Sequence, residues 1–477
     1  MDELALASYL DRSKDRILAS LVEWLRIPSV SADPERAPEV RAAAEMCAGF
    51  AREAGMHGVE LLEAGGPGGP PVVYCEWLGA GPDAPTVLVY GHTDVQPTDP
   101  LDEWESPPFE PLVKDSVLSA RGASDDKGQV IMQIEAARGL LAERGGLPVN
   151  LKMLFEAEEE VGSPHFEQLL EAERERLSAD VVVVSDTTME APEIPTTTIG
   201  MRGLVAFDVV VRTAPADLHS GIWGGTVPNA ALVAARMACA LHDEHRRVTL
   251  PGFYDDVAEP SKEEAASLAA VPFDEEAFRR TAGVAYLEGE EGRTPRQRTG
   301  TRPTAELVGF HAGYGGPGMK TIVPATANFK VALRLVPDQR PDKIAEAFRR
   351  WATEQAPAGV EISLTQFGGV APMVTPSGHP ALRCLSRAME KVWGKEPLFE
   401  RSGGSGPEEA LARVLGAPVI SLGIALPGDR FHAPNETLSL EQLWRGVLAA
   451  GELLLELGTL NLAKARDEGP ATGKGTQ

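Results

Sequence analysis

The chain has 477 residues, 43% of them hydrophobic, which is the composition of a globular protein large enough for more than one domain. The formal net charge is −25, and the pI is near 4.8. Because excess acid repels phosphate backbones and anionic headgroups, we expect neither nucleic acid nor a membrane surface as a partner.

The first 25 residues carry acidic side chains and alternate apolar with polar residues at helical spacing. This pattern predicts an amphipathic helix, since a secretory signal would begin with basic residues. No later stretch approaches the roughly 18 uninterrupted apolar residues of a membrane span. The four cysteines, at 47, 75, 239 and 384, have no paired spacing. We therefore predict reduced thiols and a cytoplasmic protein.

After a second predicted helix at 38–55, apolar runs of strand length alternate with helical segments such as 125–146. The expected strands span residues 71–79, 85–91, 149–157, 179–186 and, much later, 417–425. Runs that are apolar throughout are typical of strands covered on both faces. The sequence thus predicts an α/β domain with a mostly parallel sheet covered by helices.

The pattern changes between residues 198 and 375. Expected there, in order, are a strand at 203–213, a helix at 227–245, a strand at 327–337, a helix at 341–355 and a strand at 360–368. This order resembles a ferredoxin-like α+β sandwich. We predict that 198–375 is an inserted domain, that 1–197 and 376–462 form the α/β domain, and that the polar tail 463–477 is disordered. The charged segment 245–325 has no clear pattern.

Several predicted strands of the α/β domain end on side chains that can bind metals. The candidates are His92 and Asp94 in "GHTD", Glu159 and Glu160 in "FEAEEEVGS", Asp186 in "VVVVSD", His432 in "FHAPNE", and Asp125 and Asp126 in "ARGASDDKG". Because ligands bind outside the carboxyl ends of strands in open α/β sheets, we expect these segments to meet at one rim. Singly, each has a simpler explanation: a structural histidine, a solvated acidic face, or a helix cap.

Carboxylates crowded into one crevice repel one another unless cations neutralise them. Imidazole and carboxylate ligands without thiolate suit zinc, and also manganese or cobalt. Two ions about 3.5 to 4 Å apart that share a carboxylate and a water would use the whole set. Together the motifs predict two divalent metal ions per subunit, with a bound water whose pKa falls to about 7.

These motifs resemble a known family over nearly the whole chain. Its members are the cocatalytic dinuclear metallopeptidases, which include carnosinase, the cytosolic nonspecific dipeptidases, the aminoacylases, the succinyl-diaminopimelate desuccinylases and the glutamate carboxypeptidases. The segments that look most like the nonspecific dipeptidase and carnosinase branch are "GHTDVQP", "LSARGASDDKG", "EEVGS", "DLHSGIWGG", "RLVP" and "GGSGPEE". The resemblance implies a catalytic α/β domain and an inserted lid that also forms a homodimer.

The resemblance also implies roles for the candidate residues. One metal would be bound by His92, Asp125 and Asp186, and the other by Asp125, Glu160 and His432, so that Asp125 bridges the two. Glu159 would be the general base, and Asp94 would orient His92. We expect the adjacent Glu159 and Glu160 to point in opposite directions because successive side chains alternate in an extended segment. A cis peptide bond between Asp125 and Asp126 is also implied.

Further positions match residues that bind substrate in the family. Arg334 would hold the terminal carboxylate of the substrate, and Ser405 would bind substrate from a Gly-rich loop. His219 and Thr321 match lid residues that reach the active site of the partner subunit, where His219 would stabilise the oxyanion. At Gly406 the chain departs from the family pattern, in which isoleucine is expected before the proline.

The implied activity is hydrolysis of dipeptides by a metal-bridging hydroxide with Glu159 as the base. Asp186 favours this assignment, since a glutamate there is typical of the glutamate carboxypeptidases. One alternative is an N-acyl-amino-acid amidohydrolase, which needs the same metal site but no free substrate amine. A second alternative is a metal-bound interaction protein of the same fold, which would not need Asp94 and Glu159.

Overall fold

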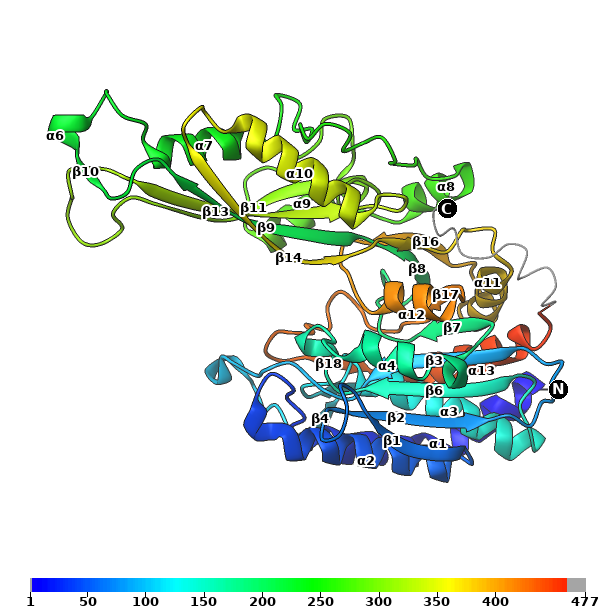
Figure 1. Ribbon diagram of the computed structural model, residues 1–477. Helices are drawn as coiled ribbons and strands as arrows, with labels where there is room; N and C mark the ends of the chain where they lie inside the picture. Colours follow the sequence, from blue (N-terminus) through cyan, green and yellow to red (C-terminus); the bar gives the residue numbers. More distant parts are fainter. Residues whose placement is uncertain (1, 461–477) are drawn as a thin grey trace.

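The computed structural model describes residues 2–460, so the predicted tail 463–477 lies outside the described residues. Figure 1 shows two regions connected through a small sheet, a larger one that contains both ends of the described chain and a smaller one that extends away from it. The strands of the two regions form separate sheets. Within 2–460, none of the helices has the length and apolar run that crossing a membrane requires.

The larger region is built on a six-stranded sheet with the order β1-β2-β6-β3-β7-β17. Its strands are β1 (His57–Glu63), β2 (Pro71–Trp77), β3 (Thr86–His92), β6 (Asn150–Glu156), β7 (Val181–Val184) and β17 (Val419–Ser421). The strands from β6 to β17 run parallel, and β1 and β2 are antiparallel to their neighbours. Every residue of β6 and β7 is buried, which explains the uninterrupted apolar runs in the sequence.

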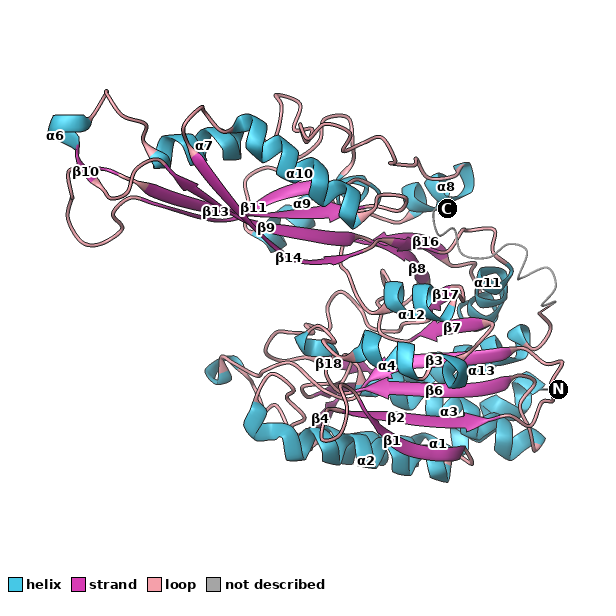
Figure 2. Cartoon of the chain, viewed as in Figure 1, coloured by secondary structure: helices cyan, strands magenta, loops and turns pink. Residues whose placement is uncertain are grey.

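Helices cover both faces of this sheet, as Figure 2 shows. One core cluster contains residues of α1 (Asp2–Leu25), α2 (Ala37–Glu53), α3 (Lys127–Arg144), α11 (Pro380–Trp393) and α13 (Leu440–Leu457). The cluster on the opposite face contains residues of α4 (Phe166–Ala172), α5 (Arg174–Leu177) and α12 (Glu408–Leu415). Consecutive strand residues such as Val87 and Leu88 belong to different clusters, as the pleat requires. The predicted α/β fold class is confirmed.

The smaller region, called the four-stranded region below (residues 203–370), has an antiparallel sheet with the order β11-β13-β9-β14. Its strands are β9 (Gly203–Arg212), β11 (Thr304–Ala312), β13 (Thr326–Leu335) and β14 (Glu361–Val370). Buried residues alternate along β9 and β13 and pack against α7 (Ala230–Cys239) and α10 (Pro341–Gln355). α7 is shorter than the predicted helix 227–245, because the chain turns back after Cys239 and Thr249 donates a hydrogen bond to Leu241 O.

At the far end of the four-stranded region lie β10 (Leu218–His219), β12 (Ile322–Val323) and α6 (Ser220–Trp223) (Figure 1). The charged segment that the sequence left unassigned contains α8 (Lys262–Ala270), α9 (Glu275–Ala282) and the π-helical turn η4 (Gln297–Thr301). α8 packs on β16 (Leu398–Ser402), and the buried Glu264 pairs with Arg401. A distant strand therefore stabilises this helix.

The structure also contains two sheets of three short strands each, and the first of them lies where the larger region meets the four-stranded region. β8 (Thr196–Met201) pairs in parallel with β16 and antiparallel with β15 (Met373–Val374). The chain enters and leaves the four-stranded region beside this sheet, where a Cβ at Gly203 would collide with Val370 O. The other sheet contains β4 (Leu112–Lys114), β5 (Val117–Ser119) and β18 (Thr437–Ser439). Three 3₁₀ turns complete the described elements: η1 (Pro34–Arg36), η2 (Leu101–Glu103) and η3 (Glu159–Val161).

Candidate metal centre

The carboxyl end of the six-stranded sheet gathers the side chains that the sequence singled out. β3 ends at His92, β6 ends three residues before Glu159, and β7 ends two residues before Asp186. Asp125 directly precedes the Asp126 cap of α3. Because β3, β6 and β7 are parallel, their carboxyl ends meet at one edge. We call this edge, with His92, Asp125, Glu160, Asp186 and His432, the metal edge.

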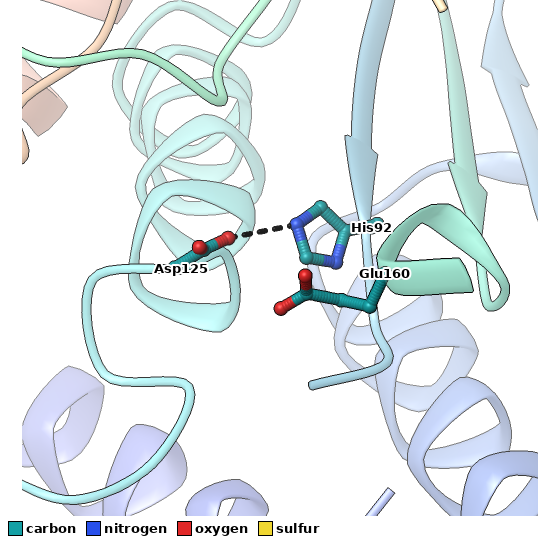
Figure 3. Close-up of side chains that lie close together, drawn as sticks. All are labelled: His92, Asp125 and Glu160. Atoms are coloured by element: carbon teal, nitrogen blue, oxygen red, sulfur yellow. Dashed lines mark hydrogen bonds and ion pairs between the residues drawn. The ribbon is translucent and has the colours of Figure 1, made fainter. Parts of the chain in front are cut away.

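Asp125 lies between two imidazoles and presents one oxygen to each. Its Oδ1 is 3.0 Å from His92 Nε2, and its Oδ2 is 3.0 Å from His432 Nε2. On the His92 side, Asp186 Oδ2 is 3.7 Å from Nε2. On the His432 side, Glu160 Oε2 is 3.2 Å from Nε2. Figure 3 shows how His92, Asp125 and Glu160 point toward one another.

These separations fit two divalent cations. Ligand atoms about 2.0 to 2.2 Å from a tetrahedral ion lie roughly 3.3 to 3.6 Å from each other, close to the separations of 3.0 to 3.7 Å at the metal edge. Glu160 Oε1 is buried and has no hydrogen-bond partner among the described residues, as expected of a carboxylate that has a cation to bind. The donor set, two imidazoles and three carboxylates, therefore fits the ions that the sequence implied.

Asp126 also lies within ligand distance of His92 and Asp186. However, its Oδ2 accepts the backbone N–H of His92 at 3.0 Å, and its carboxyl group is fully buried. Burial, followed by repulsion from Asp186, raises the pKa of Asp126 well above its usual value. These contacts suit a residue that fixes the end of β3, and they leave Asp125 as the carboxylate between the imidazoles. The peptide bond between Asp125 and Asp126 is cis, as the resemblance implied.

The electrostatics of the metal edge are those of a strongly coupled cluster. Hydrogen bonds to Asp125 and Glu160 raise the pKa of His432 to about 10. Burial alone would raise the pKa of Asp125, but the hydrogen bonds from His432 and His92 outweigh it and hold this pKa below its usual range. Asp125 is thus ionised beside positive charge, which divalent cations would supply in place of the imidazolium protons.

Glu159 and Glu160 differ in their surroundings. The backbone N–H of Glu160 donates to Asp94 Oδ2 at 3.1 Å, and Glu160 Oε2 accepts a hydrogen bond from Gln96 Nε2 at 2.7 Å. Glu159 lines a cavity of about 300 Å³ in front of the metal edge. Burial, with repulsion from Glu160 and Asp125, raises the pKa of Glu159 to about 7, a value suited to a group that exchanges a proton near neutral pH.

The backbone of Glu159 and Glu160 is not extended, so the predicted conformation of this pair was wrong. We expected Glu159 and Glu160 to lie in an extended segment, but both lie in the 3₁₀ turn η3 that follows β6. A turn with three residues per revolution directs neighbouring side chains about 120° apart, which is enough to separate a cavity-facing glutamate from one held at the metal edge.

Asp94 connects two of the proposed ligands. The hydrogen-bond partner of His92 Nδ1 is the backbone O of Asp94 at 3.1 Å, with Asp94 Oδ1 3.3 Å away. Asp94 Oδ2 accepts the backbone N–H of Glu160. The side chains of Asp94 and His92 are both fully buried. This arrangement fixes the orientation of the His92 ring, so that Nε2 faces Asp125.

Glu436 also organises the site, and the sequence analysis missed it. Its buried carboxylate accepts the backbone N–H groups of Gly122, Ser124 and Asp125 and a charged hydrogen bond from Arg121. Glu436 therefore ties the loop of Asp125 to the loop of His432, four residues away. The sequence feature that could have pointed to Glu436 is its position at the end of the motif "FHAPNE".

The predicted carboxylate-binding residues lie together beside the cavity. Arg334 Nη1 donates to Ser405 Oγ at 3.1 Å, and Ser405 Oγ donates to Arg202 O at 2.6 Å. Ser405 lines the same cavity as Asp125, Glu159, Asp186 and His432. Arg202 is a second half-buried guanidinium, which sequence reasoning missed. Burial and the nearby Arg334 lower its pKa to about 10, as expected where two cations share a space suited to an anion.

His219 and Thr321 do not join this group within the chain. Both belong to the far end of the four-stranded region, where the backbone N–H of Ser220 donates to Thr321 O and His219 pairs with Ile322. Figure 1 shows this end extending away from the six-stranded sheet. His219 is exposed, and its Nδ1 accepts the backbone N–H of Gly221 at 3.0 Å.

Residues 88–456 match the family described as Peptidase family M20/M25/M40. The chain is 29% identical to a Cys-Gly metallodipeptidase of Schizosaccharomyces pombe, over 93% of this chain and 95% of the relative. It is 29% identical to the human Beta-Ala-His dipeptidase, over 95% of this chain and 92% of that relative. Among solved structures, an M20 family metallo-carboxypeptidase from Sulfolobus solfataricus superposes with a TM-score of 0.81 at 31% identity, over 93% of this chain and 99% of that one.

Proposed function

The chain belongs to Peptidase family M20/M25/M40, and from this membership we propose that it is a dinuclear metallopeptidase that hydrolyses the peptide bond of dipeptides. The observation that carries the proposal is the position of Asp125, with one carboxylate oxygen 3.0 Å from each of two imidazoles. The names of its relatives, a Cys-Gly metallodipeptidase and a Beta-Ala-His dipeptidase, support dipeptides as the substrate class.

His92, Asp125 and Asp186 would hold one ion, and Asp125, Glu160 and His432 the other. When bound, the two ions would polarise the scissile carbonyl and lower the pKa of the water that attacks it. Nitrogen and carboxylate ligands in this number favour zinc, and manganese or cobalt would also fit. Asp94 would keep His92 oriented in the ligand position, supported by its contact with His92 Nδ1.

Glu159 would act as the general base. It lines the cavity without being held by the hydrogen bonds that fix Glu160, and burial raises its pKa to about 7. A carboxylate so placed can take a proton from the attacking water and pass it to the leaving amine. Arg334 would hold the terminal carboxylate of the substrate, with Ser405 between the guanidinium and the cavity.

We also propose a homodimer in which residues 198–375 act as the lid and dimerisation domain. β11 is an edge strand that exposes Leu307, Val308 and Phe310, and α6 exposes Ile222 and Trp223. An edge strand with an apolar surface is a favourable place for a second copy to bind. The partner would bring its His219 to stabilise the oxyanion and its Thr321 to contact the substrate. This is supported by the position of both residues at the far end of the four-stranded region.

A cytoplasmic location is proposed from the thiols. Cys47, Cys75 and Cys384 are buried and Cys239 is exposed, and all four are free. Free thiols persist in a reducing compartment.

The test is to strip the protein of metal, reload it with Zn²⁺, Mn²⁺ or Co²⁺, and assay dipeptides, tripeptides and N-acetyl amino acids. We expect turnover of dipeptides that requires metal. Preference for N-acetyl amino acids would support the amidohydrolase alternative. Preference for tripeptides would favour the carboxypeptidase activity named for the Sulfolobus solfataricus structure, and no turnover would leave the metal-bound interaction protein.

A further inference from the structure

The segment 402–408, which runs from the last residue of β16 to the first residue of α12, departs from the dipeptidase pattern at Gly406. This segment is called the substrate loop below, because its Ser405 contacts Arg334. Gly406 and Glu408 line the cavity of about 300 Å³ that also contains Glu159 and Asp186. The departure therefore lies in the wall of the space where a substrate would bind.

Glu408 is an unpartnered carboxylate in that wall. Glu408 is the first residue of α12 and is 4% exposed, and its Oε2 has no hydrogen-bond partner among residues 2–460. Within the described chain, no cationic side chain forms an ion pair with it. Burial, and then repulsion from Glu159, raise the pKa of Glu408 to about 7, against the effect of its own backbone N–H. Such a group is costly to bury unless a cation joins it.

Gly406 provides the space that this carboxylate occupies. A Cβ added at Gly406 would collide with Glu408 Oε2, the far end of a flexible side chain. The backbone of Gly406 does not have a positive φ, so the glycine serves to leave room for the carboxylate and not to satisfy the backbone conformation. An isoleucine, as the family pattern would have it, would displace the carboxylate. The glycine at 406 and the acid at 408 are therefore one feature of this chain.

We propose that Glu408 is a specificity-determining residue that binds an ammonium group of the substrate, either the free N-terminal amine or a basic side chain. The inference rests on the proposed peptidase function and names the substrate class within it. Asp125 and Asp186 face His92 at the metal edge, where bound cations would share their charge. Glu408 has no such partner and remains available to a cationic ligand.

The test compares two pairs of substrates in the metal-loaded enzyme: Ala-Gly with N-acetyl-Ala-Gly, and Lys-Gly with Leu-Gly. The variant is Glu408→Gln, which keeps the shape of the side chain and removes its charge. The matched control is Glu409→Gln, because the neighbouring Glu409 already pairs with Arg413 at 2.9 Å. We expect wild type to prefer the cationic member of at least one pair, and Glu408→Gln to reduce that preference by roughly 10- to 100-fold, the effect of losing a charged hydrogen bond.

The two pairs separate the two sources of the ammonium group. Loss of discrimination in the first pair assigns Glu408 to the N-terminal amine, and loss in the second assigns it to a basic side chain. Gly406→Ala, which pushes the carboxylate aside, should change the same ratio in the same direction and carries the test if Glu408→Gln does not fold. Unchanged ratios, or an equal fall for all four substrates, would overturn the inference while leaving the peptidase proposal intact. A wild type inactive on all four would overturn both.

Discussion

The metal edge and the substrate loop lie on the same cavity but are built differently. At the metal edge several groups are tied to another element, since Asp94 bonds to η3 and Glu436 bonds to the loop of Asp125. The oxygens without a hydrogen-bond partner there, such as Glu160 Oε1, belong to the proposed metal ligands and their neighbours. In the substrate loop, Glu408 is buried with an oxygen that bonds to nothing in the described chain. The hydrogen-bonded metal edge suits a reaction shared by a whole family. The unpartnered carboxylate of Glu408 suits the selection of a particular substrate.

We expect the largest effect on turnover from an experiment that substitutes the proposed base, Glu159, and the proposed ligand, Glu160, one at a time. Glu159→Gln should retain two metals per subunit and lose turnover by about 10² to 10⁴, because a general base is removed. Glu160→Gln, its matched neighbour, should lower the metal content instead. Elemental analysis alongside kinetics decides the assignment, and the reverse pattern would mean that the two glutamates have exchanged roles.

A smaller loss should follow from weakening the connection between the two ligand loops. Glu436→Gln keeps the shape of the buried side chain but weakens its bonds to Arg121 and the N–H groups of the Asp125 loop. Metal affinity should fall by about 10- to 100-fold, as for other groups that orient ligands. The control is Glu441→Gln on the exposed face of α13, and competition with a metal-binding dye is the measurement. Unchanged affinity would show that Asp125 does not depend on Glu436.

The smallest signal to be measured, a partial recovery of activity, concerns the far end of the four-stranded region. His219→Ala and Glu159→Ala are each expected to be inactive, and subunit exchange between them should restore about a quarter of wild-type activity. Random pairing makes about half the dimers mixed, and each mixed dimer has one intact site of two. If exchange is verified by mass and activity stays absent, His219 does not act on the partner's site.

How much could be foreseen from the sequence differs along the chain. The metal edge was predictable because apolar strands such as β3 and β6 end on polar residues, and the resemblance that these motifs carry is confirmed by the family match. The turn η3 could not be predicted, because three acidic residues in a row carry no signal that distinguishes a 3₁₀ turn from a strand end.

Other features depend on contacts between distant segments, which no local pattern records. α8 is stabilised by the pairing of Glu264 with Arg401, 137 residues away. Glu436 acts on a loop more than 300 residues earlier. The meaning of Gly406 likewise required the position of the Glu408 carboxylate, since the sequence showed only that an expected side chain was missing.

The central claim is that Asp125 bridges two metal ions at the metal edge, and anomalous diffraction from crystals of the metal-loaded protein tests it most directly. We expect two anomalous peaks about 3.5 to 4 Å apart, one beside His92 and Asp186 and the other beside Glu160 and His432, with one oxygen of Asp125 on each. A single peak, or two peaks joined by Asp126 or another carboxylate, would contradict it.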